Sequence, residues 1–155
     1  MSETPGNSAP DLSFVQIDRA NLGEYQKVHD IRAVFTQEYG ATQEENATDD
    51  DKCDIYLLYD GTQPVATARA NYVQGKGVCI CRIAVPPQLQ GKGLGQFVVR
   101  KLIDLYLPTL KPNENIFLGS FMKTISYYEK LGFVKSGDVY VDENQFPLQP
   151  MIYKP

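Results

Sequence analysis

The chain of 155 residues contains little histidine, little cysteine and no long apolar run. It has no stretch of about 18 apolar residues, so we predict no membrane-spanning helix and no membrane partner. A zinc site needs several nitrogen, sulfur or oxygen ligands, and His29 is the only histidine beside Cys53, Cys79 and Cys81. We therefore expect no bound metal. The odd number of cysteines favours reduced thiols lining the core of a cytoplasmic protein.

Positive charge is not in excess either. Lys and Arg number 15 against 19 Asp and Glu, which gives a net charge of −4. Nucleic-acid binding depends on basic patches, so this balance argues against a nucleic-acid partner. An acidic stretch within residues 41–54 either attracts a cationic ligand or is a solvated loop.

Length and composition fit one globular domain that buries a core. Hydrophobic residues make up 43% of the chain and charged residues 22%, as in ordinary globular proteins. The opening segment, MSETPGNSAP, is small and polar and lacks the basic-then-apolar pattern of a signal peptide. We expect a flexible leader at residues 1–10 and a single domain at residues 11–155.

Hydrophobic spacing predicts strands and helices along the domain. The predicted strands are 12–17, 53–60, 64–74, 78–85, 115–120, 133–141 and 150–154, and the predicted helices are 21–39, 93–107 and 122–131. Asn21 is expected to cap the first helix, while Gly40 and Gly132 end the first and third. Short turns join the strands between 53 and 85, so these should pair antiparallel. The order β-α-β-β-β-α-β-α-β-β predicts an α+β domain with a mixed, mostly antiparallel sheet flanked by helices.

The segment QGKGLG, residues 90–95, lies between a predicted strand and a predicted helix. Glycines let the backbone approach a ligand closely, and the N–H groups at a helix N-terminus favour an anion such as pyrophosphate. A Walker A motif does not fit, because Lys92 is followed by Gly93 and not by Ser or Thr. A Rossmann fingerprint would need a glycine at Gln96 and a βαβ unit.

A double proline precedes this turn. Pro86 and Pro87 donate no hydrogen bond, so strand pairing must stop there and leave main-chain groups free for a ligand. A ligand with an amide-rich arm and a pyrophosphate would use both the strand end and the glycine turn. Coenzyme A has this form.

Two segments carry a resemblance to a known family. RIAVPPQLQGKGLGQFVVRKLI resembles the acyl-CoA-binding motif of the GNAT superfamily of N-acetyltransferases, Gln/Arg-x-x-Gly-x-Gly/Ala, through Gln90, Gly93 and Gly95. ISYYEKLGFVKSGDVY resembles the second signature of the family, F-Y-E-K-x-G-F. Both occur in the order of the family, and the predicted order of strands and helices fits it. An uncharacterised bacterial GNAT subgroup has sequences similar to three further segments of this chain, RAVFTQEYG, ATARA and CRIAV.

The resemblance implies an acetyl-CoA-dependent N-acetyltransferase in which both substrates bind together and an amine attacks the thioester directly. It implies that main-chain groups of Ile83, Ala84 and Val85 bind the pantetheine arm and polarise the thioester carbonyl. The turn residues implied in binding the pyrophosphate are Gln90, Gly91, Lys92, Gly93, Leu94, Gly95 and Gln96. Ser120 stands where relatives often place a polar contact to the cofactor.

Tyr128 matches the signature tyrosine, which the resemblance implies as general acid or hydrogen-bond donor to the departing thiolate; core packing is the alternative. In some relatives a glutamate on the strand before the glycine turn acts as the general base, and this chain has Cys81 at that position. An amine with a pKa of about 10.4 must lose a proton before it attacks. Glu38 is the best carboxylate candidate for that base, with a solvated surface glutamate as the alternative. His29 is expected to be a surface or packing residue.

Two other interpretations stay open. One is a GNAT-fold module that binds CoA without catalysis, acting as a sensor or interaction domain. The missing strand glutamate supports it, as does the lack of a histidine in residues 145–148, where the bacterial subgroup often has one. The other is a nucleotide-binding protein, which the missing Walker Ser/Thr disfavours. The acceptor is a small-molecule or peptide amine, bound by loops 36–54 and 138–150, and a homodimer is left open.

Overall fold

The structure is a computed structural model that describes residues 10–39, 48–142 and 144–155. Residues 1–9 of the predicted leader and residues 41–47 of the acidic stretch fall outside the described residues. The strands are β1 Leu12–Ile17, β2 Asp54–Asp60, β3 Gln63–Val73, β4 Gly77–Ala84, β5 Asn115–Phe121, β6 Phe133–Lys135, β7 Tyr140–Val141 and β8 Pro147–Tyr153. The α-helices are α1 Leu22–Tyr39, α2 Leu94–Tyr106 and α3 Ile125–Lys130, and a 3-10 helix spans Thr48–Lys52.

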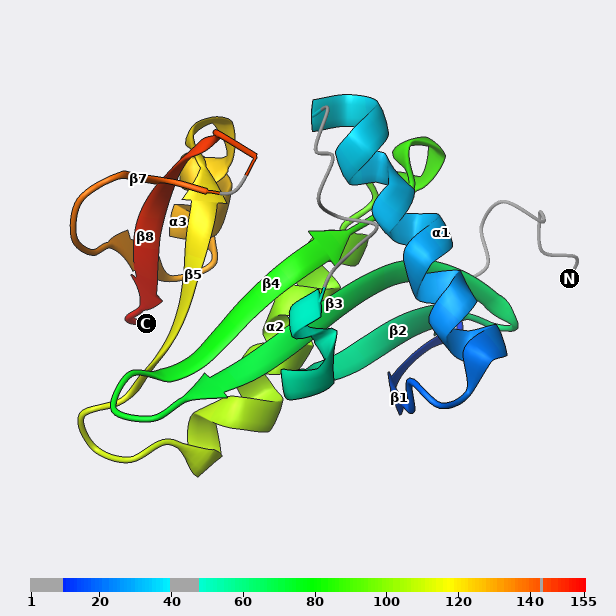
Figure 1. Ribbon diagram of the computed structural model, residues 1–155, viewed down its shortest axis with the longest axis horizontal. Coiled ribbons are helices and arrows are strands. Elements are labelled where there is room, and N and C mark those ends of the chain that lie inside the picture. Colours follow the sequence, from blue (N-terminus) through cyan, green and yellow to red (C-terminus); the bar gives the residue numbers. More distant parts are fainter. Residues whose placement is uncertain (1–9, 40–47, 143) are drawn as a thin grey trace, which may run out of the picture.

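Within the described ranges the strands form one mixed sheet in the order β1-β2-β3-β4-β5-β8-β6, with β7 on β8. The pairs from β1 to β4 are antiparallel, as the short turns predict, and β4 pairs with β5 in parallel. Figure 1 shows α1 lying across β2, β3 and β4, with α2 on the opposite face. The predicted α+β fold is confirmed.

Helical spacing of apolar residues explains how α1 and α2 cover the two faces of the sheet. In α1, Val28, Ile31, Val34 and Phe35 are buried in a cluster with Ile55 and Leu57 of β2. The neighbouring β2 residues Tyr56 and Leu58 belong to the second cluster, which contains the buried face of α2. The alternation along β2 therefore places one set of side chains under each helix. Asn21 caps α1 as predicted, since its Oδ1 accepts the N–H of Glu24 at 3.2 Å.

The C-terminal part differs from the prediction in three places. The last strand, predicted at 150–154, begins at Pro147 and ends at Tyr153. The predicted strand 133–141 is broken into β6 and β7, because Gly137 adopts a φ of +81° in the turn between them. The predicted helix 122–131 begins as a 3-10 turn over Met122–Thr124 and becomes α-helical only at Ile125. There Thr124 Oγ1 donates to the carbonyl of Phe121, a side-chain bond that competes with regular helix formation.

The parallel contact between β4 and β5 is short. It joins Gly77, Val78 and Cys79 to Asn115, Ile116 and Phe117, and among the described residues β4 has no sheet partner on this side beyond Cys79. On its other side β4 carries one extra residue between the pairs Arg69–Cys81 and Thr67–Ala84. At this bulge Arg82 has a φ of +51°. The bulge bends β4 away from β5, and the two strands diverge (Figure 1).

Candidate active site

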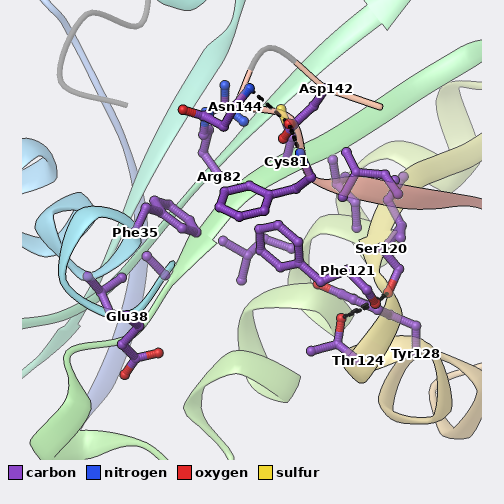
Figure 2. Close-up of a pocket in the computed structure, with 18 of the residues that line it drawn as sticks. Phe35, Glu38, Cys81, Arg82, Ser120, Phe121, Thr124, Tyr128, Asp142 and Asn144 are labelled. Carbon is purple, nitrogen blue, oxygen red and sulfur yellow. Dashed lines mark hydrogen bonds between the residues drawn. The ribbon is translucent and has the colours of Figure 1, made fainter. Parts of the chain in front are cut away.

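A cleft opens where β4 and β5 separate, and we call it the strand cleft (Figure 2). One wall is the C-terminal half of β4 with the end of α1, and the other is the end of β5 with the segment from Asp142 to Leu148. Side chains facing it include Phe35, Glu38, Cys81, Arg82, Phe121 and Phe146. Its volume of about 170 Å³ has room for a few water-sized groups and not for a whole coenzyme.

A second, larger hollow of about 430 Å³ lies over the glycine turn, and we call it the glycine groove. Its walls are the end of β4, the turn from Leu89 to Gln96, and Tyr127 of α3. The groove and the strand cleft share Ile83, Val85, Gln90, Thr124 and Tyr128. The two spaces therefore adjoin one another.

The glycine turn presents unpaired main-chain donors to the groove. Gly91 and Gly93 have φ values of +81° and +82°, which glycine adopts without strain. A Cβ at either position would meet no described atom within 4 Å, so both face open space. The first bond of α2 runs from the N–H of Phe97 to the carbonyl of Gly93. The N–H groups of Leu94, Gly95 and Gln96 consequently have no acceptor within the helix and are available to an anion.

Gln90 ties the strand end, the turn and α1 together. Its Nε2 donates to the carbonyl of Val85 at 2.9 Å and to Oε1 of Glu38 at 3.2 Å. The side chain of Gln90 thus holds the turn against β4. The same contact places the exposed carboxylate of Glu38 at the rim of the strand cleft.

Tyr128 lines both the cleft and the groove. Its ring also packs edge-on against Phe133, with ring centres 5.8 Å apart. The two interpretations offered by the sequence, a site residue and a packing residue, are therefore compatible in one side chain. Tyr127 lines the groove only, and burial raises the pKa of its hydroxyl.

Ser120 lies on the cleft side rather than in the glycine groove. Its Oγ donates to the carbonyl of Phe121 at 2.8 Å and lies 2.9 Å from Oγ1 of Thr124. Thr124, which the sequence did not single out, lies at the junction of cleft and groove. No sequence motif predicts that the hydroxyl groups of Ser120 and Thr124 lie close together, so the sequence did not reveal this pair.

The far wall of the cleft comes from the C-terminal segment, within the loop 138–150 that the sequence suggested for acceptor binding. Asp142 Oδ1 accepts the N–H groups of Asn144 and Phe146 at 2.9 and 2.8 Å. This bonding fixes the turn so that Phe146 packs edge-on against Phe121, with ring centres 5.7 Å apart. Together with Phe35 these rings give the cleft an apolar lining.

His29 packs its ring edge-on against Tyr25, with centres 4.4 Å apart, which agrees with the expected packing residue. Among the described residues, no group of three or more His, Cys, Asp or Glu side chains is arranged to hold a metal ion. No helix in the described part of the chain is long and apolar enough to cross a membrane.

In this structure two strands diverge beside a glycine-rich helix N-terminus, and a cleft and a groove meet at a tyrosine. This arrangement defines the N-acyltransferase class of fold that the motifs suggested. The chain belongs to the acetyltransferase (GNAT) family, which matches residues 16–133.

Solved structures agree with this assignment. An acyl-CoA N-acyltransferase from Pseudomonas aeruginosa is 20% identical, with a TM-score of 0.77, over 92% of this chain and 99% of that one. ElaA from Escherichia coli is 20% identical, with a TM-score of 0.76 and the same coverage of 92% and 99%. An aminoglycoside 6'-N-acetyltransferase solved with coenzyme A is 18% identical, with a TM-score of 0.69, over 90% and 95%. These likenesses establish the shared fold.

Proposed function

We propose that this protein transfers an acetyl group from acetyl-CoA to a primary amine by direct attack within a ternary complex. The observation that carries the proposal is the junction of the glycine groove and the strand cleft at Ile83, Val85 and Tyr128. A coenzyme in the groove would bring its thioester to this junction. An amine in the cleft would meet it there.

The groove suits the two polar parts of coenzyme A. The N–H groups from Gly91 to Gln96 would bind the pyrophosphate at the positive end of α2. The main chain from Ile83 to Val85, at the C-terminal end of β4, lacks a strand partner on the β5 side in the described structure and would bind the pantetheine amides. An N–H group of this segment would also stabilise the oxyanion that forms during attack.

The chemistry removes two protons from the acceptor nitrogen and delivers one to sulfur. The ammonium group of the acceptor gives its first proton to a base, the free amine attacks the thioester carbonyl, and the C–S bond breaks to release CoA as a thiolate. The nitrogen loses its second proton as the neutral amide forms, and this proton balances the one that the thiolate takes up. Glu38 at the rim of the cleft is positioned to receive the first proton through water. Tyr128 at the junction is positioned to donate a hydrogen bond or a proton to the leaving sulfur.

The acceptor is constrained by the lining of the strand cleft. Phe35, Phe121 and Phe146 favour an apolar body next to the amine, while the carboxylate of Glu38 favours its positive charge. A small-molecule amine or a peptide terminus with an apolar side chain fits this description.

Release of free thiol from acetyl-CoA across a panel of amines tests the proposal. We expect release with at least one apolar primary amine. Gly93→Val should abolish acetyl-CoA binding, because its side chain would enter the open space where the pyrophosphate must lie. Gly137→Val is the matched control, since Gly137 has nearly the same φ, +81°, and also faces open space, but lies outside the groove. Equal binding by the two variants would count against this seat for the coenzyme.

The same assay separates the enzyme from a non-catalytic CoA-binding module. The second candidate is favoured by Cys81, which stands on β4 in place of a carboxylate. Such a module would bind acetyl-CoA but release no thiol with any amine of the panel. Failure to bind acetyl-CoA at all would contradict both candidates.

A further inference from the structure

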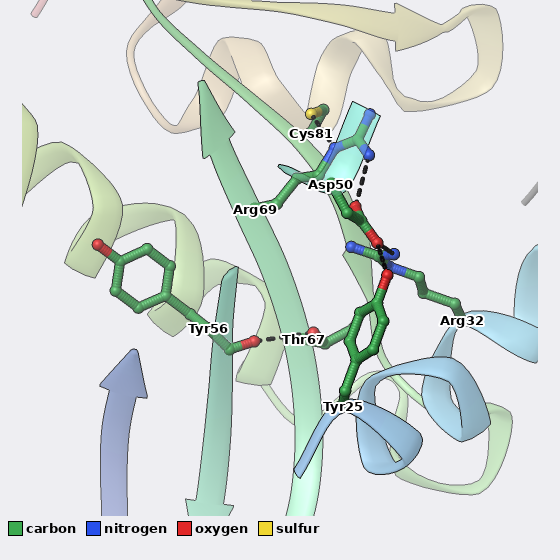
Figure 3. A network of polar contacts seen from close by, with 7 residues as sticks. All are labelled: Tyr25, Arg32, Asp50, Tyr56, Thr67, Arg69 and Cys81. Carbon is green, nitrogen blue, oxygen red and sulfur yellow. Dashed lines mark hydrogen bonds and ion pairs between the residues drawn. The ribbon is translucent and has the colours of Figure 1, made fainter. Parts of the chain in front are cut away.

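A buried polar cluster adjoins the strand cleft at Cys81 (Figure 3). Asp50, at the 3-10 helix, accepts hydrogen bonds from Nη1 of Arg32 and Nη1 of Arg69, each at 2.7 Å. Tyr25 donates a third bond to the same carboxylate at 2.5 Å. Relative exposure is 1% for Asp50, 1% for Arg32 and 6% for Arg69, so the charges are removed from solvent.

The charges in this cluster do not balance. Among the described residues, two guanidinium groups face one carboxylate, which leaves one net positive charge buried. Nε and Nη2 of Arg32 are also buried without an acceptor among the described residues. Burying an uncompensated charge is costly, so a further anion next to the arginines would stabilise the cluster.

Cys81 is in position to supply that anion. Its Sγ accepts a hydrogen bond from Nε of Arg69 at 3.1 Å, and its side chain faces the strand cleft beside Arg82 (Figures 2 and 3). Interaction with the thiol of Cys79 lowers the pKa of the Cys81 thiol, burial raises it, and the charge of Arg69 lowers it, with a net fall. The pKa of Cys79 is raised, so Cys79 keeps its proton, and its Sγ lies 4.0 Å from the carbonyl oxygen of Ile80.

Other titratable groups around Cys81 leave this assignment intact. Tyr140 of β7 is close enough to interact with the sulfur, and burial raises the pKa of its hydroxyl, so it stays neutral. Cys53 also interacts electrostatically with Arg69. Asp142 and Glu38 face the same cleft from the opposite wall and the end of α1.

We propose that Cys81 is a thiolate at neutral pH and a site of covalent modification by soft electrophiles that enter the strand cleft. The thiolate, and not the thiol, is the nucleophilic form of cysteine. Its neighbour Cys79 does not line the cleft. With iodoacetamide the sulfur attacks the methylene carbon, a C–S bond forms, the C–I bond breaks and iodide leaves, so no further reactant is required.

Alkylation of the native protein by iodoacetamide tests the proposal, with each cysteine quantified by peptide mass spectrometry from about pH 5 to pH 9. We expect the rate at Cys81 to follow a titration with a midpoint below neutrality. Cys79, whose pKa is raised, should follow a midpoint above about 8.5, the value of an ordinary thiol. A rate at Cys81 that rises with a midpoint of about 8.5, or no alkylation of Cys81 at pH 7, would overturn the proposal.

Ultraviolet absorbance of the thiolate gives a second measurement that needs no entry of reagent. At pH 7 we expect Cys81→Ser to remove one thiolate equivalent, while Cys79→Ser removes none, because the pKa of Cys79 is raised. Arg69→Gln should raise the pH midpoint of thiolate formation at Cys81. If that variant does not fold, the absorbance difference between the wild type and Cys81→Ser remains decisive. Thiolate absorbance without alkylation would overturn the modification site. None of these readouts depends on transferase activity, so failure of the proposed function is seen separately in the thiol-release assay.

Discussion

Single side chains join remote parts of this molecule. Asp50 is the clearest case, because one buried carboxylate connects α1 through Arg32, β3 through Arg69 and the 3-10 helix to which it belongs. Burial raises its pKa, but hydrogen bonds from Arg32 and Tyr25 outweigh that effect and lower the pKa to about 2. The charged form is thus favoured in the folded state.

This pKa shift predicts a stability loss in acid. The folded-state pKa of Asp50 lies below the unfolded value of 3.8, so the stabilisation is present above about pH 4 and is lost as pH falls through about 2. The loss amounts to about 2 kcal/mol in the free energy of unfolding. It can be measured by urea unfolding at stepped pH.

Asp50→Asn tests the cluster at pH 7. The variant leaves two buried arginines without their carboxylate, and we expect a loss of about 3–5 kcal/mol in unfolding free energy. Asp51→Asn is the matched control, because Asp51 is exposed and its change should stay within about 0.5 kcal/mol. Equal losses in the two variants would show that the buried charge does not stabilise the fold.

Tyr128→Phe tests the proposed role at the thioester. A phenol with a pKa of about 10 protonates a thiolate inefficiently, so we expect kcat to fall by about tenfold or less, with little change in KM for acetyl-CoA. Tyr127→Phe should instead act on KM, since Tyr127 lines only the glycine groove. Steady-state kinetics with an acceptor from the amine panel separate the two effects. A change in KM alone at Tyr128 would contradict its proposed role.

Among the elements, β4 decides where the site can form. Its first residues pair with β5, and its bulge at Arg82 turns the remainder away. The pairing requires a glycine at its start, because a Cβ on Gly77 would lie 1.9 Å from the carbonyl oxygen of Asn115. The close approach of these two backbones fixes the hinge point of the strand cleft.

Gly77→Ala should therefore cost far more than Gly75→Ala. Both glycines have positive φ, and that strain alone costs about 1–3 kcal/mol for alanine. A Cβ on Gly75 would meet no described atom within 4 Å, so only the strain applies there. We expect Gly77→Ala to lose at least about 2 kcal/mol more in chemical denaturation, or to fail to fold. Similar losses at both positions would mean that β4 and β5 are not held this closely.

At the scale of the whole molecule, the sheet consists of two parts that share one short contact. β1 to β4 with α1 and α2 form one part, and β5, β8 and β6 with α3 form the other. The strand cleft and the glycine groove have walls from both parts. A ligand in these spaces would hold the two parts together.

Acetyl-CoA should thus stabilise the molecule as a whole. At a concentration of about 100 times Kd the gain is about 2.7 kcal/mol, which corresponds to a rise in Tm of about 5–10 °C for a domain of this size. Hydrogen exchange should slow most at residues 82–85 and 91–96. No rise in Tm at saturating acetyl-CoA, with no protection of residues 91–96, would contradict the proposed cofactor.

Local patterns in the sequence determined much of the architecture. The helical spacing and Asn21 predicted α1, short turns predicted the antiparallel strands β2 to β4, and the two motifs predicted the family. These features depend on neighbours within a few positions, so periodicity and turn chemistry reveal them. The break at Gly137 was not predicted, because β-like residues lie on both sides of this glycine and the local sequence does not reveal its positive φ.

The contents of the site were decided by the tertiary structure. Asp50 lies 18 positions from Arg32 and 19 from Arg69, and Cys81 lies 12 positions from Arg69. Whether a carboxylate or a thiol in such a place is charged depends on burial and on partners from other elements, which no local pattern encodes. The apolar wall of Phe121 and Phe146 likewise exists only because β5 and the turn at Asp142 fold side by side. The sequence alone therefore located the glycine turn, and packing at long range made the cleft beside it.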